Sequence, residues 1–103
     1  MATDSFATFV LEQLGADGGG PITARRMFGS LGLYRHDVFF GIISQGHLYL
    51  KTSDATRAAY EAHGMGPFQP RAGQTLKNYY EVPVDILEDP DTLAEWVAEA
   101  VRQ

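Results

Sequence analysis

The sequence predicts an α+β fold, a two-layer sandwich in which an antiparallel sheet of about five strands is covered by helices mainly on one face. Residues 27–52 consist of short apolar stretches separated by turn residues, which is typical of consecutive antiparallel strands. The segments at both ends of the chain instead repeat apolar residues at helical spacing. The predicted order of elements is therefore α-β-β-β-β-α-β-α.

The first predicted helix covers about residues 4–14, where apolar residues recur on one face. The glycine-rich segment that follows, residues 15–20, predicts a loop. A phosphate-binding loop would need Lys followed by Ser or Thr at the start of a helix, and residues 21–23 are Pro-Ile-Thr. The glycines are therefore interpreted as a connection and not as a phosphate site.

Strands are predicted next over residues 22–28, 31–34, 38–44 and 47–51. The 38–44 strand is apolar on both faces, so we expect it to be central in the sheet and covered on both sides. The connections between these strands are short, and short turns join antiparallel strands rather than parallel ones.

The second half of the chain begins with a helix predicted over residues 55–63. Residues 64–75 are rich in Gly and Pro and are expected to form a long irregular loop, a kind of segment that is often functional. A strand is predicted over residues 76–82, followed by a final helix that starts at Asp89. Trp96 is expected to anchor this helix to the core.

Length and composition restrict the class of protein. The chain has 103 residues, which predicts a single domain over residues 1–103. Its formal net charge of -5 disfavours direct binding to nucleic acid, which usually requires a basic surface. It contains no cysteine, so disulfides and thiolate-bound metals are excluded. The sequence shows neither a secretory signal nor an apolar run of the roughly 20 residues that a membrane span needs, so we expect a cytoplasmic protein.

No catalytic or metal site is predicted. His36, His47 and His63 are far apart in the sequence and have no short-spaced partner ligand. No serine lies in a Gly-x-Ser-x-Gly motif, and the acidic residues near the last helix are interpreted as helix-capping groups rather than an acid-base pair. We therefore expect a protein that is not an enzyme and that uses no cofactor.

The candidate binding residues lie within or beside the predicted sheet, where basic residues gather, whereas the terminal helices are mostly acidic. A sheet face that carries both cations and tyrosines could accept an anion, a nucleotide or an acidic partner. The alternative is that these are ordinary solvated positions. Lys51 is the strongest candidate, since it could pair with Glu81 or bind a ligand. The candidate residues are Arg25, Arg26, Tyr49, Lys51, Arg71, Lys77 and Tyr79.

Self-association is a further prediction. The two-sided apolar strand at residues 38–43 and the 6 Phe, 5 Tyr and 1 Trp residues exceed what one layer of short helices can cover. A homodimer that buries the second face of the sheet, or that pairs exposed edge strands, would cover them.

Several short motifs, spread over nearly the whole chain, resemble the N-terminal domain of the TfoX (Sxy) family. They are Arg26-Met27-Phe28-Gly29, Gly32-Leu33-Tyr34, Val38-Phe39-Phe40-Gly41, Leu48-Tyr49-Leu50-Lys51-Thr52, Gly64, Pro67-Phe68, Tyr79-Tyr80, Val82-Pro83, and the closing helix with Trp96 and Ala100. The resemblance implies an α+β domain that occurs either fused to a C-terminal helical domain in competence regulators or alone in small proteins. Because this chain ends directly after the last predicted helix, it is similar to the stand-alone form. Pro70 departs from the family pattern, which tends to have an aromatic residue there.

The resemblance implies a non-enzymatic binding or regulatory module, like the competence regulators, that acts through contacts with a partner protein. One alternative is a small-molecule or anion sensor, or a small enzyme, with a pocket under the 64–75 segment in which Arg71 would meet an anionic ligand. Direct nucleic-acid binding is the third possibility, and the net charge argues against it.

Overall fold

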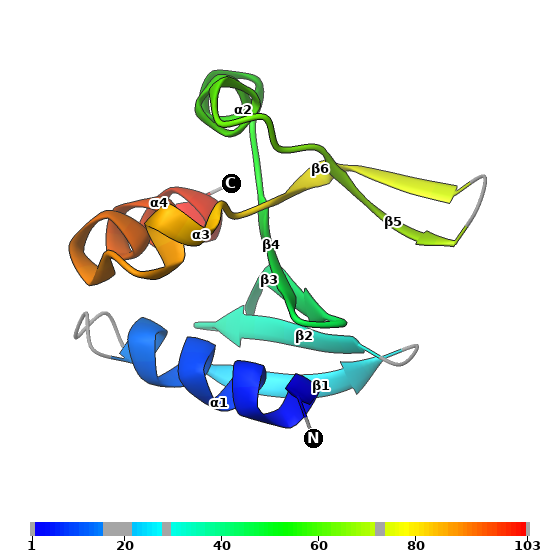
Figure 1. The fold of residues 1–103 in the computed structure, drawn as a ribbon, viewed down its shortest axis with the longest axis vertical. Helices are drawn as coiled ribbons and strands as arrows, with labels where there is room; N and C mark the ends of the chain where they lie inside the picture. Colours follow the sequence, from blue (N-terminus) through cyan, green and yellow to red (C-terminus); the bar gives the residue numbers. More distant parts are fainter. Residues whose placement is uncertain (1, 16–21, 28–29, 72–73, 103) are drawn as a thin grey trace.

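The computed structural model describes residues 2–15, 22–27, 30–71 and 74–102. These residues form a six-stranded antiparallel sheet and four helices, which confirms the predicted α+β class with one strand and one short helix more than expected (Figure 1). The helices are α1 (Ala2–Gly15), α2 (Asp54–Ala62), α3 (Val84–Leu87) and α4 (Pro90–Arg102), and the strands are β1 (Thr23–Met27), β2 (Ser30–Arg35), β3 (Val38–Ser44), β4 (His47–Lys51), β5 (Pro67–Arg71) and β6 (Gln74–Glu81).

The strands lie in the order β1-β2-β3-β4-β6-β5, so β1 and β5 are the two edges of the sheet. The first strands form a meander because tight turns connect them. His36 and Asp37, between β2 and β3, both have positive φ angles, of 53° and 65°. Gln45 and Gly46 repeat this geometry between β3 and β4, with φ angles of 50° and 79°. Turns with two positive φ angles match the twist of antiparallel strands and keep their register fixed.

The segment predicted to be an irregular loop, residues 64–75, contains the edge strand β5 instead. β5 pairs with β6, and the register shifts on both sides of Phe68. The prolines of this segment are compatible with a strand because β5 is at the edge of the sheet. On the outer side of an edge strand there is no neighbouring strand, so a residue without an amide hydrogen breaks no inter-strand hydrogen bond there. The Gly and Pro content therefore marks an irregular edge strand.

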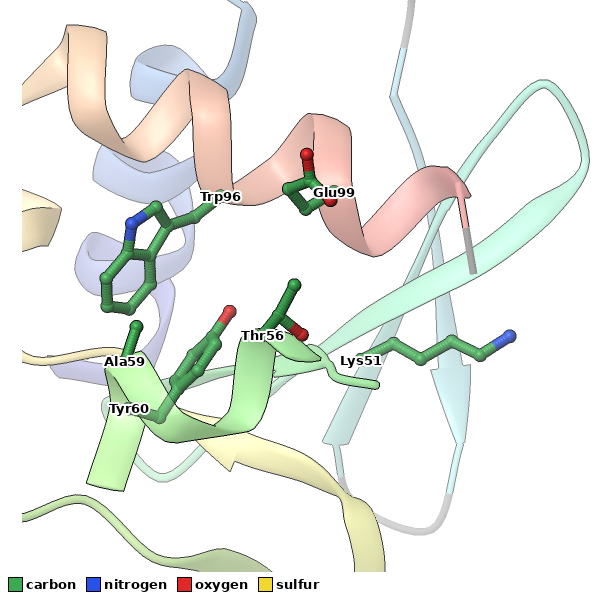
Figure 2. A pocket seen from close by; sticks show the side chains of 6 residues that line it. All are labelled: Lys51, Thr56, Ala59, Tyr60, Trp96 and Glu99. Atoms are coloured by element: carbon green, nitrogen blue, oxygen red, sulfur yellow. The ribbon is translucent and has the colours of Figure 1, made fainter. Parts of the chain in front are cut away.

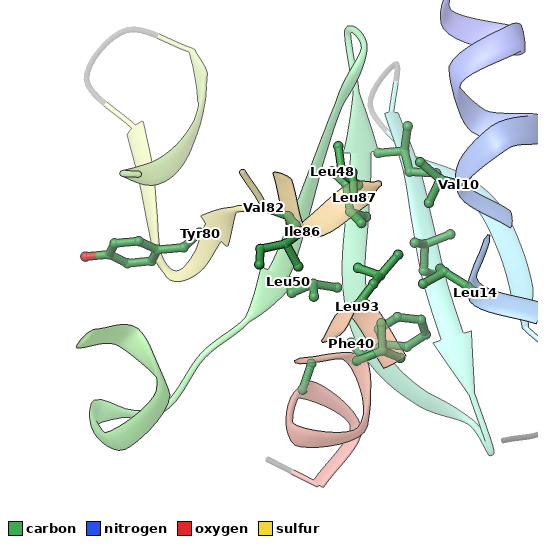
Figure 3. Close-up of a cluster of buried hydrophobic side chains, with 14 of the residues drawn as sticks. Val10, Leu14, Phe40, Leu48, Leu50, Tyr80, Val82, Ile86, Leu87 and Leu93 are labelled. Carbon is green, nitrogen blue, oxygen red and sulfur yellow. The ribbon is translucent and has the colours of Figure 1, made fainter. Parts of the chain in front are cut away.

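The core lies between the helices and one face of β2, β3 and β4. Leu48 and Leu50 are fully buried and alternate along β4 with the exposed His47 and the half-buried Tyr49 and Lys51, as the period of a half-covered strand requires. Side chains of α1, α3 and α4 meet them from the other side (Figure 3). The largest fully buried side chains are Phe40, Leu14, Leu33, Ile43, Leu48, Leu50, Leu93, Val10, Val82 and Val97.

Trp96 anchors α4 as predicted, but against α2 as well as the core. Its ring centroid lies 4.4 Å from that of Tyr60 and 5.9 Å from that of His63. The start of α2 is fixed by a capping box, in which Ser53 and Thr56 bond to each other's backbone amides. α2 lies beside β6, at the far end of the sheet from α1 (Figure 1), where Tyr80 donates a hydrogen bond to Glu61 and Arg57 donates one to Asn78.

Candidate functional site

The face of the sheet that points away from the buried core can be traced through the strand register. Ile42 of β3 pairs with Tyr49 of β4, and Lys51 of β4 pairs with Tyr79 of β6. Paired residues of antiparallel strands point to the same face, so these four side chains share it. We call this surface the open face, and its members are Arg25, Tyr34, Phe39, Ile42, His47, Tyr49, Lys51, Phe68, Lys77, Tyr79 and Glu81.

Aromatic rings cover the middle of the open face. The ring of Phe39 lies between those of Tyr34 and Tyr79, at centroid distances of 5.2 and 5.4 Å. Tyr49 and Phe68 form a second contact at 4.4 Å. Tilted pairs at these distances stabilise each other beyond their buried area. The rings therefore form a preordered apolar surface, which lowers the entropy cost of binding a partner.

Three cations stand beside these rings. The guanidinium carbon of Arg25 lies 5.3 Å from the ring centroid of Tyr34, within the range of a cation–π interaction. Lys51 stands opposite Tyr79 in the register. Lys77 lies two residues from Tyr79 along β6, and Asn78 between them accepts a hydrogen bond from Arg57 of α2 on the helical side, so alternation places Lys77 and Tyr79 on the open face. Within the part of the chain that the structure describes, no salt bridge neutralises any of the three. Their charges are therefore available to an anionic partner.

The acidic group on the same face is already paired. Nδ1 of His47 lies 2.6 Å from Oε2 of Glu81, so Glu81 is bonded to histidine and not to Lys51, the partner considered from the sequence. This pair sits at the other end of β4 from Lys51. Lys51 and the His47–Glu81 pair therefore lie at opposite ends of β4 on the open face, and Arg25 lies on the edge strand β1.

Two tyrosines of the open face, Tyr49 and Tyr79, remain neutral at physiological pH. Burial raises the pKa of Tyr49, and the Glu81 carboxylate raises it further. Burial also raises the pKa of Tyr79, with a smaller contribution from Tyr34. Neutral phenols donate hydrogen bonds, so these residues add donors beside the lysines without adding negative charge. The chemistry of the face suits carboxylates or phosphates embedded in an apolar segment.

The structure brings together five of the seven residues predicted from the sequence: Arg25, Tyr49, Lys51, Lys77 and Tyr79.

The other two predicted residues are placed differently. Arg26 pairs with Leu31, whose side chain packs against the core, so Arg26 is on the opposite face from Arg25. Arg71 is the last residue of β5, and its side chain lies outside the described residues.

Sequence reasoning missed Tyr34, Phe39 and Phe68. Simple alternation along residues 38–44 places Phe39 with the inward-facing residues. A register shift between Leu33 and Tyr34 inverts the alternation, so that Phe39 points outward and Phe40 inward. Such an irregularity leaves no mark in the hydrophobic pattern. Phe68 was missed because its strand was interpreted as a loop.

Two hollows lie on the helical side. A cavity of about 100 Å³ between α2 and α4 is smaller than the roughly 300 Å³ of a typical ligand pocket. Lys51 is among its lining residues, but in Figure 2 the rings of Tyr60 and Trp96 lie next to each other and the side chain of Lys51 extends away from them. A depression of about 480 Å³ lies beside α4, between Arg35 and Arg102. Residues 64–75, where a ligand pocket was the alternative prediction, line neither hollow.

The described residues contain neither a candidate metal site nor a helix that could span a membrane. No group of three or more His, Asp and Glu side chains is placed to hold a metal ion there. No helix in this part of the chain has the length and apolar character needed to cross a membrane.

Comparison with known proteins gives two findings. The sequence model of the family described as TfoX N-terminal domain matches residues 12–103, a range that includes the whole open face. The DNA transformation protein TfoX1 of Aliivibrio fischeri is 30% identical over 85 residues, which is 81% of this chain and 41% of that protein. The chain thus spans about two fifths of the length of this curated relative.

Proposed function

Because the chain belongs to the TfoX N-terminal domain family, we propose that it is a regulatory module of the competence type that acts in the cytoplasm by binding a protein partner. Residues 1–103 would fold and act as one domain. The observation that carries the proposal is the open face, a surface on which ordered aromatic rings stand beside three cations, none of which forms a salt bridge with another described residue. We expect its partner to present carboxylates on an apolar segment.

The composition of the open face is suited to protein recognition. Aromatic residues and Arg are enriched in protein interfaces, where aromatic rings supply most of the contact energy. Arg25 is held over Tyr34 before any partner arrives, so less side-chain freedom is lost on binding. Lys51 and Lys77 provide point charges that favour acidic partners and reject basic ones.

Nucleic acid is a poorer match for the same surface. A duplex-binding protein typically contacts about 6–10 phosphates through basic side chains. The open face offers three cations on a chain whose formal charge is -5, so most of the molecule repels phosphate.

The proposed function is tested with a chimera in which this chain replaces the aligned segment of TfoX1 in Aliivibrio fischeri. The assay is the frequency with which cells take up and inherit a marker gene. We expect the chimera to restore transformation in cells that lack TfoX1. A chimera that is folded and expressed but gives no transformants would contradict the proposal.

A charge-reversal series then tests the surface. Lys51→Glu together with Lys77→Glu should lower transformation by about tenfold or more, since two attractions become repulsions. Arg102→Glu is the matched control, because it reverses one charge on α4, on the helical side of the molecule. If the unmodified chimera, the double variant and the Arg102→Glu control give equal transformation, the open face is not the docking surface. Fluorescence anisotropy with a labelled duplex at about 0.15 M salt should show no binding to DNA.

A further inference from the structure

The two edges of the sheet differ in their protection against strand addition. β5 contains prolines and has register shifts around Phe68, which are devices that discourage another strand from pairing with an edge. β1 has neither device. It contains no proline, and its five residues pair with β2 in unbroken register from Thr23↔Tyr34 to Met27↔Ser30.

The outer side of β1 is also accessible. Four consecutive residues, 23–26, are exposed to solvent, and β1 ends the strand order. In an antiparallel pair, alternate backbone N–H and C=O groups point away from the neighbouring strand. On an edge strand these groups are unpaired and can bind an extended segment from another chain.

The side chains of β1 indicate which kind of segment would bind. Arg25 lies on the open face, because its partner Gly32 pairs with Ile42. Arg26 lies on the opposite face. Neither forms a salt bridge with another described residue. A strand added beside β1 would therefore meet one unneutralised guanidinium on each of its faces.

A second copy of the chain is a poor occupant of this edge. If two β1 strands pair about a two-fold axis through the middle of the strand, Arg25 stands opposite its own copy. A shift of the axis by one residue places Arg26 opposite Arg26 instead. Like charges directly opposite each other destabilise a strand pair, and the net charge of -5 on each copy adds further repulsion.

We propose that β1 accepts an extended acidic segment of the partner protein as an additional strand of the sheet. Two neighbouring carboxylates of that segment pair with Arg25 on the open face and with Arg26 on the other face. The inference rests on the proposed function and deepens it, because it names how the partner binds. Arg26 distinguishes strand addition at β1 from binding to the open face alone. It lies outside the open face, so it contributes to partner binding only if a strand is added.

The test is a titration of the ¹⁵N-labelled full chain with a capped octapeptide of alternating Thr and Val in which the two central residues are Glu. We expect amide shifts concentrated in residues 23–27, together with cross-strand Hα contacts between peptide and protein. Arg25→Glu and Arg26→Glu should each weaken binding by about fivefold or more, because one attraction becomes a repulsion. Arg102→Glu should bind like the unmodified chain.

Several results would overturn the proposal. Shifts confined to Tyr49, Lys51 and Tyr79, with Arg26→Glu unaffected, would show that the open face binds without strand addition and would leave the proposed function intact. Absence of any shift, or equal binding of the peptide with Gln in place of Glu, would reject an acidic strand at β1. Stronger binding of an oligothymidine than of the peptide would assign the arginines to nucleic acid. Thermal unfolding of each variant confirms that the protein compared is folded.

Discussion

At Gly41 of β3, the backbone of β4 leaves too little room for a side chain, and replacing this glycine with Ala should destabilise the protein. A Cβ at this position would lie 2.9 Å from the carbonyl oxygen of Tyr49 and 3.1 Å from Cδ2 of Leu50. The Leu50 methyl can shift by a rotation, but the Tyr49 carbonyl belongs to the backbone of β4 and cannot move alone. The strands must therefore separate locally, and Tyr49 would move with its strand on the open face.

The magnitude follows from two opposing effects. Overpacking a buried site costs about 1–3 kcal/mol. Removing a glycine from the unfolded chain returns about 0.4–1 kcal/mol through lower chain entropy. The net loss in the free energy of unfolding is therefore about 1–2 kcal/mol for Gly41→Ala, which for a domain of this size lowers the melting temperature by roughly 5–15 °C.

Urea unfolding followed by circular dichroism measures this loss. Gly66→Ala is the matched control, because no atom lies within 4 Å of the Cβ it would add and its φ angle is not in the positive range. We expect the control to be neutral or slightly stabilising. If Gly41→Ala unfolds at the same urea concentration as the unmodified chain, the close approach of β3 to β4 is not a constraint on the fold.

Other predictions concern pH and helix capping. Burial raises the pKa of Tyr60 far above its usual value. The free energy of unfolding is therefore unaffected by this group below about pH 10 and falls as the pH rises beyond it, because only the unfolded chain then ionises. In thermal unfolding at alkaline pH, Tyr60→Phe should show a smaller drop in melting temperature than the unmodified chain. Hydrogen bonds from Thr92 lower the pKa of Asp89. The stabilisation by this helix cap is therefore present above the usual pKa of an aspartate and is lost as the pH falls through the lowered value. In Asp89→Asn the melting temperature should depend less on pH in the acid range than it does in the unmodified chain. Ser53→Ala removes half of the capping box and should lower the free energy of unfolding by about 1 kcal/mol in urea titrations. Light scattering at micromolar concentration decides between the homodimer predicted from the sequence and the monomer expected if the open face is free surface; a stable dimer that buries this face would contradict its role in binding another protein.

The first and last residues of the central strands β3 and β4 could be predicted as the structure has them. Both faces of Val38–Ser44 and the alternation in His47–Lys51 are strong local patterns, and the turn residues between them fix the pairing. Edge strands depend instead on a neighbour that the local sequence does not reveal. β5 was predicted as a loop because its prolines break strand propensity, yet pairing with β6 overrides that preference.

Part of the candidate site could also be predicted from local sequence patterns. Alternation along β4 and β6 places Tyr49, Lys51 and Tyr79 on one face, as the sequence suggested. The homodimer expected from the aromatic content stays a prediction. Two of the three wholly apolar members of the open face, Ile42 and Phe68, are only 3% and 7% exposed within a single copy, and the third, Phe39, is half-buried. Local packing of the aromatic rings covers much of the area that was assigned to a second subunit.

Charge is distributed unevenly over the molecule, and this gives it an electric dipole. Most of the carboxylates lie in the helices or directly beside them, whereas Arg25, Lys51 and Lys77 project from the opposite side of the sheet. An acidic partner approaching in solution is repelled by the helical side and turns the domain so that its cationic side leads. Such orientation raises the association rate rather than slowing dissociation, and it weakens as salt shortens the range of the field. Partner capture by this domain would therefore be governed by how quickly the two molecules meet in a productive orientation, and it would be slowest at high ionic strength.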